Sequence, residues 1–151
     1  IQKGEKEMMI QKSESIKSLA SAQLALQKEI KDISKDSTGY GYKYTSFDKL
    51  VQYLRPLLAK HGISFIQMPD GTAGSIGLTT LYMHISGEWI ANTVLCPIAE
   101  HKGMNVYQSV GSAITYFRRY SLASFVGIAS EEDVDATNAN KKDNNEGEEK
   151  W

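Results

Sequence analysis

The chain has 151 residues, of which 41% are hydrophobic, and a net charge of −1, which suits one domain with its own hydrophobic core. Its single cysteine, Cys96, excludes an internal disulfide, and we expect it to be a packed strand residue of a protein that works in a reducing cytosol. Because the sequence lacks both an apolar run of about eighteen residues and an apolar leader, we expect neither membrane spanning nor secretion.

The first predicted element is an amphipathic helix over residues 13–33. Its apolar residues recur at helical spacing and share one half of a helical wheel: Ile16, Leu19, Ala20, Leu24, Leu26, Ile30 and Ile33. Residues 34–44 are predicted to be a loop, because they combine turn formers with two glycines. At the end of this loop, Tyr-Lys-Tyr at residues 42–44 indicates a short extended segment.

A second helix is predicted to start at Thr45 or Ser46, either of which can cap it. We expect Pro56 to kink this helix and Gly62 to end it in a left-handed conformation. Its apolar stripe is Phe47, Leu50, Val51, Leu54, Leu57 and Leu58. Three strands then follow, separated by turn signals at residues 69–71 and 86–87, and they predict an antiparallel meander of residues 63–68, 76–85 and 89–96.

A third helix is predicted from Asn105, whose side chain can cap it while Gln108 reciprocates, to Gly127. A helical wheel gives it a buried stripe of Val106, Val110, Ala113, Ile114, Phe117 and Phe125. Arg118 lies at the edge of that stripe, and the polar face holds Gln108, Ser112, Thr115, Tyr116 and Arg119. The predicted fold is α+β, with a three-stranded antiparallel meander packed on this long helix and two N-terminal helices flanking it.

The charge is unevenly distributed along the chain. From Glu131 onward eight acidic residues accompany three lysines, a net charge of −5, whereas residues 1–130 carry +4. A mildly basic body with an acidic tail is compatible with nucleic-acid binding, and equally with an ordinary surface and a solubilising tail. We expect residues 1–135 to form the domain and residues 136–151 to be a disordered acidic tail.

The most informative motif lies in the third helix and the segment after it. It contains Gly111-Ser112-Ala113, Thr115-Tyr116 and Arg118-Arg119-Tyr120, followed by Gly127 and by acidic residues at 131–135. Together with residues 42–46 and 54–62 upstream, this motif resembles the ERF (essential recombination function) family of phage single-strand DNA annealing proteins. The resemblance covers about residues 10–135, judged from element order and motif spacing.

The resemblance implies rings or filaments of subunits that bind single-stranded DNA in a basic groove and anneal complementary strands without ATP. It matches Arg118 and Arg119 to the family's basic pair, with Thr115, Tyr116 and Tyr120 around them. Guanidinium groups suit this role because they bind phosphate oxygens with two donors, to which hydroxyls add neutral donors. The alternative, considered chiefly for Arg118, is an ion pair with an acidic residue of the same chain.

Further candidates come from aromatic and basic residues in the predicted loops. Tyr40, Tyr42, Lys43 and Tyr44 either bind unstacked bases or cover the core beside a loop. Lys102 lies in a loop that either touches phosphates or is plain surface. The candidate DNA-binding residues are therefore Arg118, Arg119, Lys43, Tyr42, Tyr44, Thr115, Tyr116, Gln108 and Lys102.

Enzyme signatures are weak in this sequence. The glycine-rich residues 71–77 lack the Gly-Lys-Ser/Thr ending of a phosphate-binding loop, so we expect a hairpin turn there. The three histidines are scattered and do not suggest zinc. We therefore expect no catalytic residue, metal or cofactor. We expect the tail to contact a partner such as a single-strand-binding protein. Two alternatives stay open: a metal-dependent nuclease using acidic residues 131–135, and an adaptor without DNA affinity that recruits a replication partner through its tail.

Overall fold

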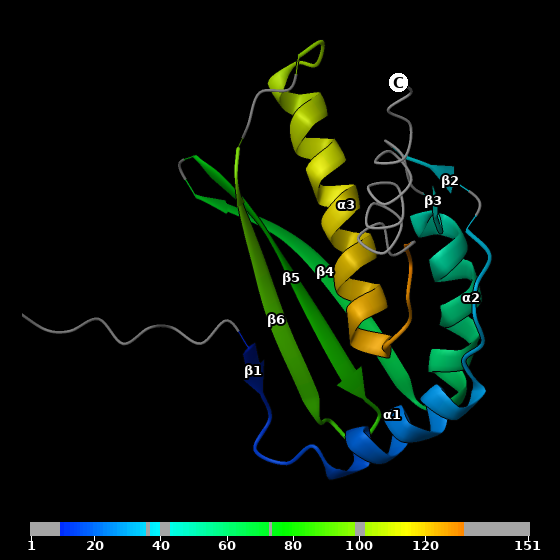
Figure 1. The fold of residues 1–151 in the computed structure, drawn as a ribbon. Helices are drawn as coiled ribbons and strands as arrows, with labels where there is room; N and C mark the ends of the chain where they lie inside the picture. The colour runs from blue at the N-terminus through cyan, green and yellow to red at the C-terminus, as the bar shows by residue number, and fades with distance from the viewer. Residues whose placement is uncertain (1–9, 36, 40–42, 73, 99–101, 132–151) are drawn as a thin grey trace, which may run out of the picture.

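The computed structural model describes residues 10–35, 37–39, 43–72, 74–98 and 102–131. Over these residues the fold is α+β, as predicted, with three helices beside an antiparallel sheet (Figure 1). None of the described helices is long and apolar enough to cross a membrane. In chain order the elements are β1 (Ile10–Lys12), α1 (Lys17–Glu29), β2 (Ser37–Thr38), β3 (Lys43–Tyr44), α2 (Phe47–Lys60), β4 (Ile63–Thr72), β5 (Ser75–His84), β6 (Trp89–Pro97) and α3 (Val106–Val126).

The main sheet has four antiparallel strands in the order β1-β6-β5-β4, and β2 and β3 form a separate pair. The predicted meander of β4, β5 and β6 is confirmed. The prediction of a three-stranded sheet was wrong, because β1 adds a fourth strand through pairs such as Ile10 with Asn92. Three exposed residues are too few to show the alternation that identifies a strand in a sequence.

The β4–β5 hairpin extends further than its sequence predicts. The turn expected at residues 69–71 lies inside β4, where Pro69 pairs with Leu78. Proline is tolerated at this position because β4 is an edge strand. The chain reverses between the paired residues Thr72 and Ser75, within the glycine-rich segment that was predicted to form a hairpin turn.

The predicted helix over residues 13–33 is confirmed only in its middle, at Lys17–Glu29. A carboxylate from the β5–β6 turn caps its first turn, since Glu88 accepts hydrogen bonds from the Leu19 backbone nitrogen at 2.8 Å and the Ser15 hydroxyl at 2.9 Å. The bond from Leu19 is the main cause that holds the pKa of Glu88 below its ordinary value. A cap that comes from 69 positions away cannot be predicted from local sequence.

The C-terminal end of α2 and both ends of α3 agree with the sequence signals, whereas Ser46, the N-cap residue of α2, makes no side-chain capping hydrogen bond. α2 continues through Pro56 as one helix, and Gly62 beyond its end has the predicted left-handed conformation, with φ of 68°. At the start of α3, Asn105 and Gln108 form the predicted capping box, and Gly127 ends the helix with φ of 77°. These three helix ends depend on residues close by in the chain, which is why the sequence specifies them.

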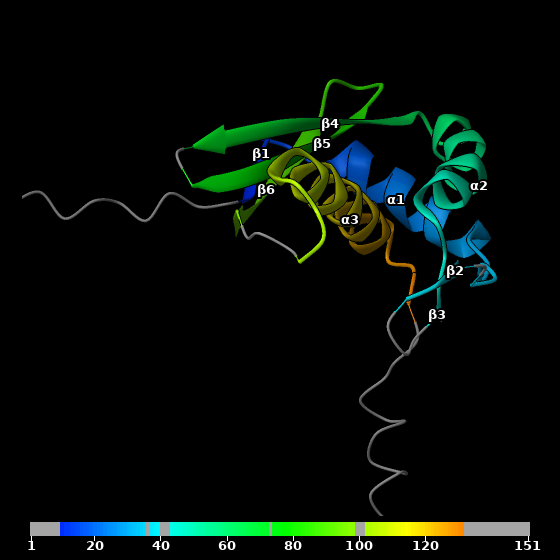
Figure 2. The ribbon, with the colours of Figure 1, turned by 90° about the horizontal axis from the view of Figure 1, so that it is seen from above.

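All three helices share one core with a single face of the sheet, along which α3 lies (Figures 1 and 2). The sequence had predicted that α1 and α2 only flank a sheet packed on α3. That arrangement was wrong, because both helices contribute residues to the central core. Within the core, Tyr82 of β5 stacks on Phe125 of α3, with ring centroids 3.3 Å apart. The buried cluster consists of Leu19, Leu26, Leu50, Leu54, Leu58, Ile63, Tyr82, Leu122, Ala123 and Val126.

The buried side of α3 differs from the predicted stripe. Val106 is 42% exposed, and the five other residues of that stripe are only half-buried. The core cluster takes residues only from the C-terminal part of α3, so apolar residues near its N-terminus have no core to join. The residues of α3 that are buried are Ser109, Arg119, Leu122, Ala123 and Val126.

Candidate nucleic-acid interface

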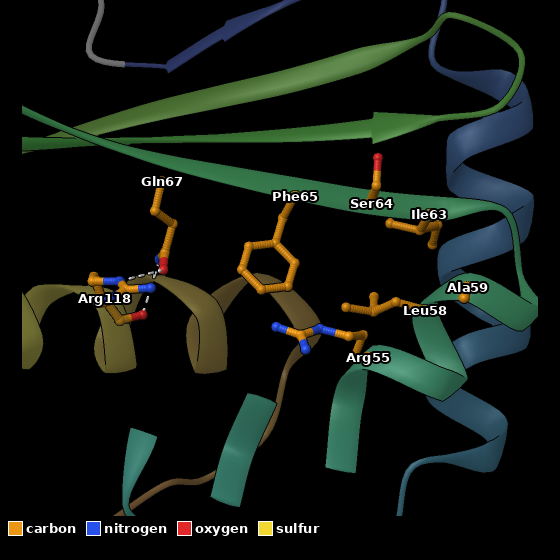
Figure 3. A pocket seen from close by; sticks show the side chains of 8 residues that line it. All are labelled: Arg55, Leu58, Ala59, Ile63, Ser64, Phe65, Gln67 and Arg118. Carbon is orange, nitrogen blue, oxygen red and sulfur yellow. Dashed lines mark hydrogen bonds between the residues drawn. The ribbon is translucent and has the colours of Figure 1, made fainter. Parts of the chain in front are cut away.

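An open pocket of about 330 Å³ lies between α2, α3 and the edge strand β4 (Figure 3). Arg55 of α2 and Arg118 of α3 stand at its two sides, and the ring of Phe65 from β4 lies between them. We call this pocket the arginine groove. Its lining is Arg55, Leu58, Ala59, Ile63, Ser64, Phe65, Gln67 and Arg118.

Contacts with β4 and α2 orient the Arg118 side chain in this groove. Its Nε donates to Gln67 Oε1 at 3.4 Å, and the Gln67 amide nitrogen donates to the Arg118 carbonyl oxygen at 3.0 Å. The guanidinium carbon lies 4.3 Å from the centroid of the Phe47 ring, within the range of a cation–π interaction. These contacts hold the guanidinium in place without neutralising its charge.

Neither arginine of the groove forms an ion pair with an acidic side chain in the described part of the chain. The intramolecular ion pair considered for Arg118 is therefore not observed among these residues. Arg55 is exposed and was not predicted as a site residue, since on the sequence it is one polar position of an amphipathic helix. Only the packing of α2 beside α3 and β4 brings it close to Arg118 and Phe65.

Arg119 has a different environment from its neighbour. It is 6% exposed, and its Nη2 donates to Glu131 Oε1 at 2.9 Å. Its guanidinium carbon lies 4.2 Å, 5.4 Å and 5.5 Å from the ring centroids of Tyr44, Tyr116 and Tyr120, respectively. We call this arrangement the tyrosine cage.

The prediction that Arg119 lies on an exposed polar face was therefore wrong. Positions three, four and seven residues after Arg119 are Leu122, Ala123 and Val126, which all belong to the core. Residues at this spacing share one side of a helix, so Arg119 is directed inward. That spacing was visible in the sequence and could have placed Arg119 on the buried side.

Glu131 closes the tyrosine cage. Its Oε2 accepts a hydrogen bond from the Tyr120 hydroxyl, and burial of Tyr120, together with this bond, raises the pKa of the phenol above its ordinary value. The backbone around Glu131 is held by a β-bridge to Tyr44 and by a 2.8 Å hydrogen bond from the Thr45 nitrogen to the Ser130 carbonyl oxygen. Both carboxylate oxygens of Glu131 are thus engaged within the chain.

The nuclease alternative needs acidic side chains that can bind a metal. Glu131, the first residue of its proposed cluster, is paired with Arg119, and residues 132–135 lie outside the described residues. Within the described ranges, no group of three or more His, Cys, Asp or Glu side chains is arranged to hold a metal ion. The described structure gives this alternative no support.

The other predicted residues do not join one site. Lys43 is exposed on β3, whereas Tyr42 lies outside the described residues. Thr115 is exposed, but its hydroxyl donates to a carbonyl oxygen of its own helix at 3.1 Å. Gln108 is engaged in the helix cap, and Lys102 is exposed in the turn before α3, so both lie at the opposite end of the helix from its core-packed part.

The fold and the groove together define a small α+β domain with a cationic, aromatic surface. The chain belongs to the ERF superfamily, whose family model matches residues 19–150, and the resemblance of its motifs to that family is thereby confirmed. No curated protein and no solved structure matches it. Membership of this family suggests a role in phage recombination through the annealing of single-stranded DNA.

Proposed function

We propose that this protein binds single-stranded DNA and anneals complementary strands without nucleotide hydrolysis or metal catalysis. The observation that carries the proposal is the arginine groove, in which Arg55 and Arg118 stand beside the ring of Phe65. Two guanidinium groups bind phosphate oxygens, and an aromatic ring stacks on an unstacked base of any sequence. Duplex DNA offers its bases already stacked, so the groove is better suited to single strands.

Annealing follows from the same contacts. Backbone phosphates carry no sequence information, so a strand held through them keeps its base edges free to find a complement. The arginine side chains that contact the strand also screen the repulsion between the two negatively charged DNA strands. A single groove supplies few cations, and we therefore propose that many copies of the chain act along one strand.

The annealing proposal predicts that the protein accelerates pairing of complementary oligonucleotides in excess chelator and with no nucleotide present. The physical reason is that positioning and charge screening require neither a metal nor hydrolysis. Fluorescence quenching between labelled strands measures the rate, and gel electrophoresis of the same samples shows whether the strands stay intact. A strict requirement for ATP would contradict the annealing proposal, and cleaved strands would favour the nuclease.

Homo-oligomerisation has support from two apolar surfaces of the chain. On the sheet face away from α3, Ile66, Met68 and Leu95 are 47%, 44% and 58% exposed, respectively. The second surface is the N-terminal part of α3, where Val106 is exposed beside Met104 and Tyr107. α3 lies on the opposite side of the sheet from the first surface (Figure 2). When two different surfaces of identical chains bind each other, the contact is head to tail and builds rings or filaments.

The assembly proposal predicts that Leu95→Glu weakens self-association at least about tenfold, because the contact would bury an unpaired carboxylate. Multi-angle light scattering over a concentration series measures the mass. Ile85→Glu is the matched control, since Ile85 is 86% exposed in the β5–β6 turn. A monomeric wild-type protein would contradict assembly, and an unchanged mass of Leu95→Glu would exclude this face as the contact.

The acidic tail, residues 136–151, lies outside the described residues. We propose, as the sequence predicts, that it binds a partner protein such as a single-strand-binding protein. Its composition supports this assignment because a polar, acidic segment cannot form a core of its own.

A further inference from the structure

We propose that the tyrosine cage is a second phosphate site for the bound DNA strand, and that Glu131 occupies it when DNA is absent. The inference rests on the proposed function, because its ligand is a phosphate of that strand. The cage and the arginine groove are neighbours in the fold. Arg119 directly follows Arg118, and their nearest aromatic partners, Tyr44 and Phe47, are three residues apart at the β3–α2 junction.

Glu131 satisfies only part of the Arg119 guanidinium. Nη2 donates to the carboxylate, whereas Nε is buried and finds no acceptor among the residues that the structure describes. A guanidinium binds an anion best when adjacent donors meet two oxygens, and a buried donor without a partner is costly. A phosphate group has enough oxygens to accept from Nη2 and Nε together, and from the Tyr120 hydroxyl that now binds Glu131.

The cage is closed by a short segment that can open without unfolding the core. Ile128 packs against the core, and residues 129–131 beyond it are held by the β-bridge of Glu131 to Tyr44, the hydrogen bond from Thr45 to Ser130, and the contacts of the Glu131 carboxylate with Arg119 and Tyr120. Segments held by so few bonds open at a lower free energy than a packed core. Tyr116, one wall of the cage, is 43% exposed, so the cage adjoins solvent.

Glu131 therefore competes with DNA phosphate for the Arg119 side chain. This local competition differs from the general repulsion that any negative charge exerts on DNA. Wild-type protein has to break the Arg119–Glu131 pair before Arg119 can bind a phosphate. Removing the carboxylate removes this competition and leaves a preformed cationic site. Removing an acidic residue elsewhere on the surface changes only the net charge.

The test compares the affinity for a thymidine oligonucleotide of the wild-type protein, Glu131→Gln, Glu131→Asp and Glu29→Gln over a range of salt concentrations. Glu131→Gln is expected to bind about tenfold more tightly, with a steeper salt dependence, because one further phosphate contact forms without competition. Glu131→Asp keeps the net charge but is one methylene shorter, so a smaller gain is expected. Glu29→Gln removes the same charge from a carboxylate that contacts Lys60 and His61, and its affinity is expected to match the wild type.

The outcomes separate this inference from the function on which it rests. If the wild-type protein binds the oligonucleotide and a folded Glu131→Gln protein binds it no more tightly, the second site is overturned and the proposed function stands. If urea titration shows Glu131→Gln to be unfolded, Glu131→Asp decides in its place, and an affinity no higher than wild type overturns the inference. An absence of binding by every one of these proteins would overturn both.

Discussion

Arg119→Ala is expected to lower the free energy of unfolding by about 3 kcal/mol, the largest stability change that we predict for one residue. The substitution removes the guanidinium beside three tyrosine rings and leaves the carboxylate of Glu131 without its cation. Breaking a buried ion pair from one side is costly because the remaining charge loses its counter-ion but stays largely out of water. The Glu131 side chain is 19% exposed, which keeps the loss at the lower end of the range for such pairs.

Urea unfolding followed by tryptophan fluorescence measures this loss, and Arg118→Ala is the matched control one position away. Arg118 lines an open groove, and without its side chain Gln67 still donates to the residue 118 carbonyl oxygen and to the Thr80 hydroxyl. The control is expected to lose less than about 1 kcal/mol. Equal losses for the two variants would contradict the distinction between a buried cage and an open groove.

The parts of the fold that the sequence predicted correctly depend on residues close together in the chain. The capping box of Asn105 and Gln108 and the left-handed glycines at 62 and 127 are local signals, and the structure has each of them in place. The meander was predictable because long alternating strands are joined by short turns. Family membership was visible for the same reason, since its motif occupies one helix and the segment after it.

The features that the sequence did not reveal depend on distant partners. β1 is a strand because β6 offers it a free edge, and α1 begins where Glu88 reaches its first turn. The arginine groove combines residues from α2, β4 and α3, and no local pattern links Arg55 to Arg118. Arg119 was misplaced for a different reason: its spacing with Leu122 and Val126 was visible in the sequence, but charged residues are usually exposed, and the buried counter-charge of Glu131 was not foreseen.

The central claim is that the arginine groove binds single-stranded DNA. We expect the double variant Arg55→Ala/Arg118→Ala to bind a thymidine oligonucleotide about 100-fold more weakly than wild type, at about 1.4 kcal/mol for each lost contact to phosphate. The slope of log affinity against log salt is expected to flatten by about 1.4, because two phosphate contacts to a single strand are lost. Both side chains line an open groove, so the fold is expected to persist.

Fluorescence anisotropy titrations at several salt concentrations test this claim most directly, with the folded state of each protein checked by urea unfolding. Lys17→Ala/Lys28→Ala is the matched control, since it removes two exposed cations from α1, and its affinity is expected to change less than about threefold through the loss of net charge alone. We predict a large loss of affinity and a flatter salt dependence for Arg55→Ala/Arg118→Ala, and neither change for the lysine control. Wild-type affinity and salt slope in a folded Arg55→Ala/Arg118→Ala protein would contradict the assignment of this groove to DNA.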